Sequence, residues 1–200
     1  MKSYSEAEIN ELILKAQNCQ TNYYGNTDTC LYSALDDFPI VDKTVVVYGS
    51  RIPWYEAICL ARGAHPITID YNIPLYNHPG IVTLNNDEEL AEPIACAFSI
   101  SSFEHDGLGR YGDPINPDGD LVAMKNLLKK MDLHGKLYLS VPVGYDGVEG
   151  NRHRIYGTER LPLLLKGWTT LKAYGMPKVL HGAGKGLKSR QPILVLTQEE

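Results

Sequence analysis

The sequence predicts a single α/β domain with a doubly wound, mostly parallel sheet. Short apolar runs rich in β-branched residues alternate with helical patterns through the middle of the chain. These runs are nearly continuous in hydrophobicity, which is typical of strands that are covered by helices on both faces. The last two runs, 168–175 and 191–198, have no helical pattern between them. They therefore predict an antiparallel pair of strands at the end of the chain.

The N-terminal part predicts one helix followed by irregular chain. Residues 5–17 begin with Ser5 and Glu8, which have the spacing of a capping box. The apolar residues of this segment recur on one helical face, and they are Ile9, Leu12, Ile13 and Ala16. Residues 18–38 are polar and rich in tyrosine, and we expect no regular structure there. We interpret residues 1–38 as an extension and 39–200 as the α/β domain.

The middle of the chain alternates between strands and helices. Residues 44–49 predict a buried strand, and 53–64 predict a helix with Pro53 in its first turn and Gly63 at its C-cap. Apolar runs predict further strands at 66–70, 80–85, 94–101 and 135–143. Helical patterns predict helices at 117–131 and 158–166, with at most a brief helix at 87–91.

Composition and charge limit the functional class. The 200 residues suit one domain, and 44% hydrophobic with 22% charged residues is ordinary for a soluble globular protein. The formal charge of −5, from 19 basic and 24 acidic residues, argues against a nucleic-acid binder that relies on bulk charge. The only local basic cluster, Lys185, Lys188 and Arg190, could face an anion, but a solvated loop is the simpler interpretation.

No segment suggests a membrane, export or redox function. The longest apolar run, 93–100, is far shorter than the roughly 18 residues of a membrane span. The cysteines are Cys19, Cys30, Cys59 and Cys96, and no two form a C-x-x-C pair. A disulfide between Cys19 and Cys30 is disfavoured. We therefore expect a cytoplasmic protein that has no membrane partner.

The unusual polar residues of the chain follow the predicted strands. In a doubly wound sheet, ligands bind at the carboxyl ends of the strands, near the switch point. This rule selects four turns, at 49–54, 70–73, 101–116 and 142–156. Asp70 ends the second strand, where a carboxylate can accept hydrogen bonds from both hydroxyls of a ribose. The alternative is that Asp70 only caps a turn, but its place at the strand end favours ligand binding.

The turn at 101–116 is the densest in functional residue types. Three of its glycines, Gly107, Gly109 and Gly112, spell the dinucleotide-binding pattern G-x-G-x-x-G. A true fingerprint follows the first strand and opens directly into a helix, whereas this one follows the fourth strand. The glycines are therefore expected to let a long loop turn and approach a ligand. A metal site made from the acids and histidine of this turn with His153 is disfavoured, because adjacent residues rarely all point at one ion.

Four segments of the chain resemble one known family. They are "YGSRIPWYEAICLARGAHPITIDYN", "SISSFEHDGLGRYGDPINPDGDLVAMKNLL", "LYLSVPVG" and "NRHRIYGTERLPLLLKGW". They resemble the family catalogued as domain of unknown function 268, a branch of the class I S-adenosylmethionine-dependent methyltransferases, over roughly residues 40–175. The resemblance implies a Rossmann-like methyltransferase fold with an antiparallel C-terminal strand, and S-adenosylmethionine as cofactor.

The first turn departs from the usual pattern of that superfamily. Its members carry an acid before G-x-G-x-G, whereas "VVVYGSRIP" keeps only Gly49 and has Tyr48 at the position of the acid. Two other features match. Asp70 occupies the position of the ribose-binding acid. The segment "SSFEH" is similar to the S-x-x-E-H stretch that lies close to the methyl-bearing sulfonium in many small-molecule methyltransferases.

Site residues follow from this resemblance and from position. Catalytic roles are expected for Glu104, His105 and Asp106, with His105 or Asp106 as the base that a hydroxyl acceptor needs. The expected cofactor-binding residues are Gly49, Ser50, Asp70, Tyr71, Ser101 and Ser102. The residues expected on the acceptor side are Arg110, Tyr111, Asp113, Asn151, His153 and Arg154. Of these, Arg110, Asn151, His153 and Arg154 could hold a polyhydroxylated or anionic acceptor. No metal ion is expected.

Three functions remain open at this point. The first is an S-adenosylmethionine-dependent methyltransferase that acts on a small polar acceptor, such as a sugar or glycan precursor. The second is a non-catalytic, methyltransferase-like binding or regulatory protein, which the reduced first turn favours. The third is a nicotinamide oxidoreductase, which the missing fingerprint disfavours. No nucleic-acid partner is expected, and no oligomeric state is predicted.

Overall fold

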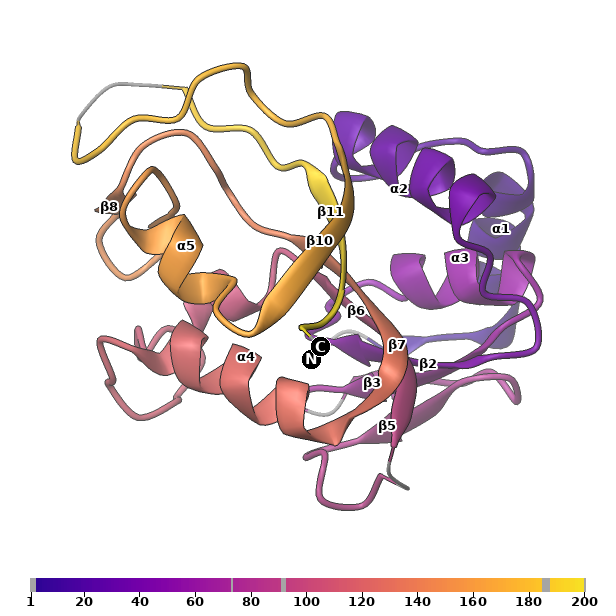
Figure 1. Ribbon diagram of the computed structural model, residues 1–200. Helices are drawn as coiled ribbons and strands as arrows, with labels where there is room; N and C mark the ends of the chain where they lie inside the picture. The colour runs from indigo at the N-terminus through magenta and orange to yellow at the C-terminus, as the bar shows by residue number, and fades with distance from the viewer. Residues whose placement is uncertain (1–2, 73, 91–92, 185–187, 200) are drawn as a thin grey trace.

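The protein is organised around one seven-stranded sheet, seen in a computed structural model that describes residues 3–72, 74–90, 93–184 and 188–199. The strand order is β10-β11-β7-β6-β2-β3-β5 (Figure 1). The strands are β2 (Thr44–Tyr48), β3 (His65–Ile69), β5 (Val82–Leu84), β6 (Ile94–Ile100), β7 (Met131–Ser140), β10 (Trp168–Tyr174) and β11 (Ile193–Gln198). The order reverses between β2 and β6, which places the switch point there.

The pairing confirms the predicted mostly parallel sheet. Strand β2 pairs in parallel with both of its neighbours, so that Val46 lies opposite Ile67 of β3 and Ala97 of β6. Strands β3 and β5, and β6 and β7, are also parallel. Strand β11 is antiparallel to β7 and to β10. The two C-terminal strands therefore form the expected antiparallel pair.

Helices cover both faces of this sheet. Figure 1 shows α1 (Glu6–Gln17), α2 (Gly25–Asp37) and α3 (Trp54–Ala61) on one side, with α4 (Gly119–Lys130) and α5 (Arg160–Leu164) on the other. Because successive side chains of a strand point to opposite faces, each strand contributes to both cores. Val45 and Val47 of β2 pack in the core with α2 and α3, whereas Val46 packs in the core with α4 and α5. This two-sided burial explains the nearly continuous apolar strands.

The N-terminal segment is more ordered than the sequence indicated. The expected capping box is present, because the Ser5 hydroxyl accepts from the amide of Glu8 at 3.3 Å and the Glu8 carboxylate accepts from the amide of Ser5 at 2.9 Å. The expectation that residues 18–38 are irregular was wrong, since α2 occupies most of them. Leu31 and Leu35 of α2 recur at helical spacing and are buried against the sheet. Polar residues on the remaining faces of α2 obscured that pattern.

The other differences are small and local. No helix forms at 87–90, where the chain makes bends and turns; residue 91 lies outside the described residues. The turn after β6 contains a short 3-10 helix, η1 (Phe103–His105). Two short ladders lie outside the main sheet, β1 (Ser3–Tyr4) with β4 (Leu75–Tyr76) and β8 (Gly147–Val148) with β9 (Arg154–Ile155). In the part of the chain that the structure describes, no helix is long and apolar enough to cross a membrane.

Candidate ligand-binding site

The principal cavity of the protein lies at the carboxyl ends of the parallel strands. Its volume is about 1680 Å³. The segments that follow β2, β3, β5 and β6 contribute its lining, and they include Gly49, Asp70, Asp87 and Ser101. A single small ligand usually occupies roughly 300–1,000 Å³. This cavity therefore has room for a cofactor-sized molecule and a second, smaller one.

The turn after β2 depends on its one glycine. Gly49 has a φ of +68°, which an L side chain rarely adopts. A Cβ at this position would also collide with the hydroxyl of Ser102, which follows β6. The amide of Gly49 donates to the carbonyl of Ile69 at 2.9 Å. Gly49 therefore lets the first turn lie directly against the segment after β6, across the switch point.

The position of Asp70 is compatible with both roles considered from the sequence, capping a turn and binding a ligand. One carboxylate oxygen accepts from the amide of Ser50 at 3.1 Å, and the other accepts from the amide of Asn72 at 2.7 Å. Asp70 thus holds two turns, and it also lines the cavity. Burial raises its pKa above the ordinary value. A carboxylate has about four lone-pair positions, so two bonds leave capacity for the hydroxyls of a ligand.

A buried carboxyl group supports the first turn from below. Glu56 of α3 is fully buried, and it accepts from the hydroxyl of Ser50 at 2.9 Å and from that of Thr68 at 2.7 Å. The phenol of Tyr76 donates to the carbonyl of Ser50 at 2.7 Å. Burial raises the pKa of Glu56 to about 7. No role was predicted for Glu56 from the sequence, although a glutamate inside the apolar helix pattern "WYEAICLA" was a usable signal.

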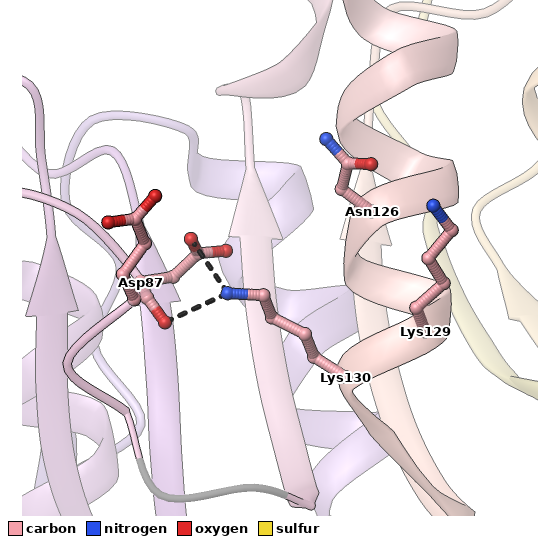
Figure 2. Close-up of a pocket in the computed structure, with 5 residues that line it drawn as sticks. Asp87, Asn126, Lys129 and Lys130 are labelled. Atoms are coloured by element: carbon pink, nitrogen blue, oxygen red, sulfur yellow. Dashed lines mark hydrogen bonds and ion pairs between the residues drawn. The ribbon is translucent and has the colours of Figure 1, made fainter.

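One wall of the cavity is fixed by an ion pair with the neighbouring helix. A smaller pocket of about 380 Å³ lies beside α4. Figure 2 shows Lys130 reaching from the end of α4 toward Asp87 in this pocket. The Lys130 ammonium lies 3.0 Å from a carboxylate oxygen of Asp87 and 3.0 Å from its carbonyl. Asp87 also accepts from the phenol of Tyr48 at 3.4 Å and lines the principal cavity. Because Lys130 is already paired with Asp87 and the principal cavity is the larger of the two, the principal cavity is the better candidate site.

The long loop after β6 is held from inside by one arginine. Only 1% of the surface of Arg154 is exposed. Its guanidinium donates to four backbone carbonyls of the loop, those of Glu104 (3.3 Å), Asp106 (2.6 Å), Asn116 (3.1 Å) and Pro117 (3.0 Å). Its Nε lies 3.5 Å from the buried carboxylate of Asp120. The expectation that Arg154 faces an acceptor is therefore corrected, since its hydrogen-bonding groups point into the protein.

The glycines and Asp113 define the turn of this loop. The Asp113 carboxylate accepts from the amides of Gly107 (2.7 Å), Gly109 (3.2 Å) and Tyr111 (3.2 Å). Gly107 has a φ of +77°, and a Cβ there would collide with the carbonyl of Asn116. The glycines thus let the long loop turn, as expected, and the turn closes around the carboxylate of Asp113. A close approach to a ligand stays a prediction.

The start of the loop carries the candidate catalytic groups. His105 Nδ1 is hydrogen-bonded to the carbonyl of Arg152, so Nδ1 carries the proton in the neutral ring and Nε2 has the lone pair. Burial lowers the pKa of His105. Burial raises the pKa of Glu104 to about 8 and that of Asp106 to about 7. Ser101 has a φ of +55°, a strained conformation that is concentrated at functional sites.

Residues from the N-terminal and C-terminal parts of the chain meet at Ser101, at the start of this loop. The phenol of Tyr24 and the amide of Gln191 both donate to the hydroxyl of Ser101, at 3.1 and 3.0 Å. Ser101 in turn donates to Glu104 at 2.6 Å, while the second oxygen of Glu104 has no partner among the described residues. Thr27 donates to the carbonyl of Gln191 at 2.8 Å. Tyr24 and Gln191 were not predicted as site residues, because no local sequence pattern links either end of the chain to this loop.

The structure brings most of the predicted residues together. Those that line the cavity are Gly49, Ser50, Asp70, Tyr71, Ser101, Ser102, Glu104, His105, Asp106, Arg110, Tyr111, Asp113 and His153. Arg154 is buried beneath the loop, and Asn151 is exposed outside the lining.

No group of three or more His, Cys, Asp or Glu side chains is arranged to hold a metal in the described ranges. Lys185 of the basic cluster lies outside the described residues.

Comparisons with known proteins connect this geometry to one family and one fold. The family described as "Caenorhabditis protein of unknown function, DUF268" matches residues 42–181. A search of curated proteins finds no match. A Burkholderia thailandensis 1,6-didemethyltoxoflavin N1-methyltransferase, crystallised with 1,6-didemethyltoxoflavin and S-adenosylhomocysteine, has a TM-score of 0.65 at 12% identity, covering 100% of this chain and 93% of that one.

Two further solved structures show how far this likeness extends. An S-adenosylmethionine-dependent methyltransferase from Clostridium acetobutylicum has a TM-score of 0.56 at 9% identity, covering 97% of this chain and 99% of that one. A Rhodobacter sphaeroides protein whose name places it with Zn-dependent alcohol dehydrogenases has a TM-score of 0.55 at 14% identity, covering 99% and 100%. At such identities the likeness shows a shared Rossmann-like fold, and function has to be argued from the site.

Replacing Arg154 with alanine tests the support of the loop. We expect Arg154→Ala to lower the free energy of unfolding by about 3–5 kcal/mol, because it leaves four backbone carbonyls without their donor and removes one of the two cations beside the buried Asp120. The matched control is Arg152→Ala, an exposed neighbour that should stay within about 0.5 kcal/mol of wild type. Urea unfolding at pH 7 measures both. Equal stability of the two variants would contradict the role given to Arg154.

Replacing Glu56 with glutamine tests the buried carboxyl under the first turn. Because the folded protein raises the pKa of Glu56 from 4.5 to about 7, its protonated form stabilises the fold at low pH and this contribution is lost as pH rises through about 7. Stability of Glu56→Gln relative to wild type should therefore rise by roughly 2–3 kcal/mol between pH 5 and pH 8. The exposed Glu11→Gln is the control. A Glu56→Gln difference that is flat with pH would show that Glu56 does not titrate in this way.

Proposed function

The chain belongs to the DUF268 family, and we propose that it is an S-adenosylmethionine-dependent methyltransferase that acts on a small polar acceptor. One observation carries this proposal. A strand-end carboxylate, Asp70, and a neutral histidine base, His105, line the same cavity at the switch point of a methyltransferase-type sheet. The first suits the ribose of a nucleoside cofactor, and the second suits removal of a proton from an acceptor.

The residues at the β2 and β3 ends fit the cofactor. Asp70 keeps lone pairs for the two ribose hydroxyls, and it is held in place by the amides of Ser50 and Asn72. Gly49 and Ser102 bring the first turn close to the segment after β6, where the reacting end of the cofactor would lie. Tyr71 provides an exposed aromatic ring beside Asp70. We assign the cofactor to this half of the cavity, where Ser50 and Ser101 also contribute to the lining.

The first turn has a single glycine, Gly49, and hydrogen bonds to its neighbour Ser50 hold the turn in place. A sulfonium cofactor has no pyrophosphate, so the turn does not need several amides that converge on phosphate oxygens. The turn is instead held by Glu56, Tyr76 and Asp70 through bonds to Ser50. The reduced glycine pattern is therefore compatible with a cofactor site. It remains the feature that favours the alternative, a non-catalytic protein that kept the fold.

The loop half of the cavity provides the acceptor side. Bound S-adenosylmethionine would supply an activated methyl group, so the protein has mainly to align the acceptor and remove its proton. Nε2 of His105 has the lone pair for that step, because Nδ1 is committed to Arg152. Asp106 is the alternative base, and Glu104 can orient the acceptor from beneath. Arg110, Tyr111, Asp113 and His153 line the remaining wall, which suits a sugar or glycan precursor.

Cofactor binding is the first test of this function. We expect S-adenosylhomocysteine to bind wild type, and Asp70→Asn and Asp70→Ala to weaken it by about 1.5–3 kcal/mol, the range for hydrogen bonds to a charged group. Isothermal calorimetry measures the affinity, with the exposed Asp36→Asn as control. Titration with NAD under the same conditions tests the oxidoreductase alternative. Binding of NAD without S-adenosylhomocysteine would reject the methyltransferase assignment.

The base role of His105 needs a kinetic test. With an acceptor identified by formation of S-adenosylhomocysteine, His105→Ala should lower turnover by about a hundredfold to ten-thousandfold. It should keep cofactor affinity and thermal stability near wild type. Asp106→Asn is measured in parallel. Turnover of His105→Ala within a few-fold of wild type would move the base role to Asp106, and absence of turnover in wild type with every acceptor tried would favour the non-catalytic alternative.

A further inference from the structure

Two arginines at the loop end of the principal cavity have no acidic partner. Arg110 and Arg190 both line the cavity, and no carboxylate lies within ion-pair distance of either among the described residues. Among the described residues, the guanidinium of Arg110 contacts the carbonyl of Arg152, at 3.4 Å, and the ring of Tyr111, at 5.5 Å. Arg62 is paired with Asp36 at 2.7 Å, whereas Arg51, which lines the other half of the cavity, and the exposed Arg152 lack an ion pair among the described residues. Arg110 and Arg190 are thus the two arginines at the loop end that are not committed to an acid.

The backbone places each arginine at a fixed point. The amide and carbonyl of Arg190 bond to Val143 at 2.8 and 2.7 Å, which anchors this residue beside the end of β7. Arg110 lies in the turn that Asp113 organises through three amides. One side chain therefore comes from the C-terminal segment and the other from the loop after β6. Both arginines line the principal cavity, which His105 also lines.

The acids at this end of the cavity compensate the charge of the two arginines in part. The carboxylate of Asp113 is occupied by loop amides. Burial raises the pKa of Glu104 to about 8 and that of Asp106 to about 7, so Glu104 is mostly neutral and Asp106 is about half neutral at pH 7. His153 lies 3.7 Å from Glu149, which gives that acid a partner of its own. The amides lower the pKa of Asp113, so this acid keeps its negative charge, and the two guanidinium groups share this end of the cavity with one ionised and one partly neutral acid.

We propose that the acceptor carries an anionic group with two or more oxygens, a phosphate or a carboxylate, and that Arg110 and Arg190 bind this group at the loop end of the principal cavity. This inference rests on the proposed methyltransferase function and narrows its substrate class. Guanidinium groups match such anions because their N–H donors form a planar fork that can bond two oxygens at once. The anion would fix the acceptor while His105 faces the group to be methylated.

Calorimetry with simple anions tests the proposal directly. Inorganic phosphate, pyrophosphate and malonate are titrated into protein with and without S-adenosylhomocysteine, at an ionic strength matched with chloride. We expect at least one anion to bind wild type with a Kd of about 1 mM or tighter. Arg110→Gln and Arg190→Gln should each weaken that binding by about tenfold or more, and the double variant should weaken it further. Arg62→Gln, outside the cavity, is the matched control.

The outcomes separate this inference from the cofactor assignment. Comparison of the phosphates with malonate distinguishes a phosphorylated acceptor from a carboxylated one. The proposal is overturned if no anion binds wild type, or if the double variant binds as tightly as wild type does. Failure of S-adenosylhomocysteine to bind, with anion binding intact and sensitive to both arginines, would instead reject the methyltransferase function and leave an anion site. Unchanged S-adenosylhomocysteine affinity in the double variant is expected, because Asp70 lies in the other half.

Discussion

The guanidinium of Arg154 is the interaction on which the candidate site depends. A loop that turns through several glycines at the end of a buried strand directs backbone carbonyls inward, where water cannot reach them. Buried carbonyls without partners are costly, and Arg154 satisfies four of them with one side chain. Its charge is balanced by Asp120, which also binds Arg160 and Tyr156. The loop can therefore be long and still hold His105 at one position.

On the other side of the cavity, the buried carboxyl group of Glu56 likewise holds a segment of the site in place. Glu56 holds Ser50 of the first turn, much as Arg154 holds the loop. The two supports come from opposite faces of the sheet, from α3 and from the short ladder beside α5, and they act on segments that meet across the switch point. A site built in this way requires fewer glycines in its first turn. This arrangement reconciles the reduced glycine pattern with a fold that resembles methyltransferases of known structure.

The features that the sequence predicted are those with a local signal. The β-branched runs, the Ser5–Glu8 capping box and the acid at the end of β3 each lie within a few residues of what they determine. Arg154 could not be assigned correctly in this way, because its carbonyl partners lie 37 to 50 residues away in sequence. An arginine next to polar residues in a turn looks the same whether it faces solvent or the interior. Helix α2 was missed because the polar residues on its outer faces outnumber Leu31 and Leu35.

A crystal structure with S-adenosylhomocysteine bound would test the central claim most directly, which is that the cavity at the switch point is a cofactor site. The account predicts both ribose hydroxyls within hydrogen-bonding distance, about 2.5–3.0 Å, of the Asp70 carboxylate. It also predicts that the sulfur lies on the side of Ser101 and His105. Density for the ligand outside this cavity, or a ribose that makes no contact with Asp70, would contradict the account.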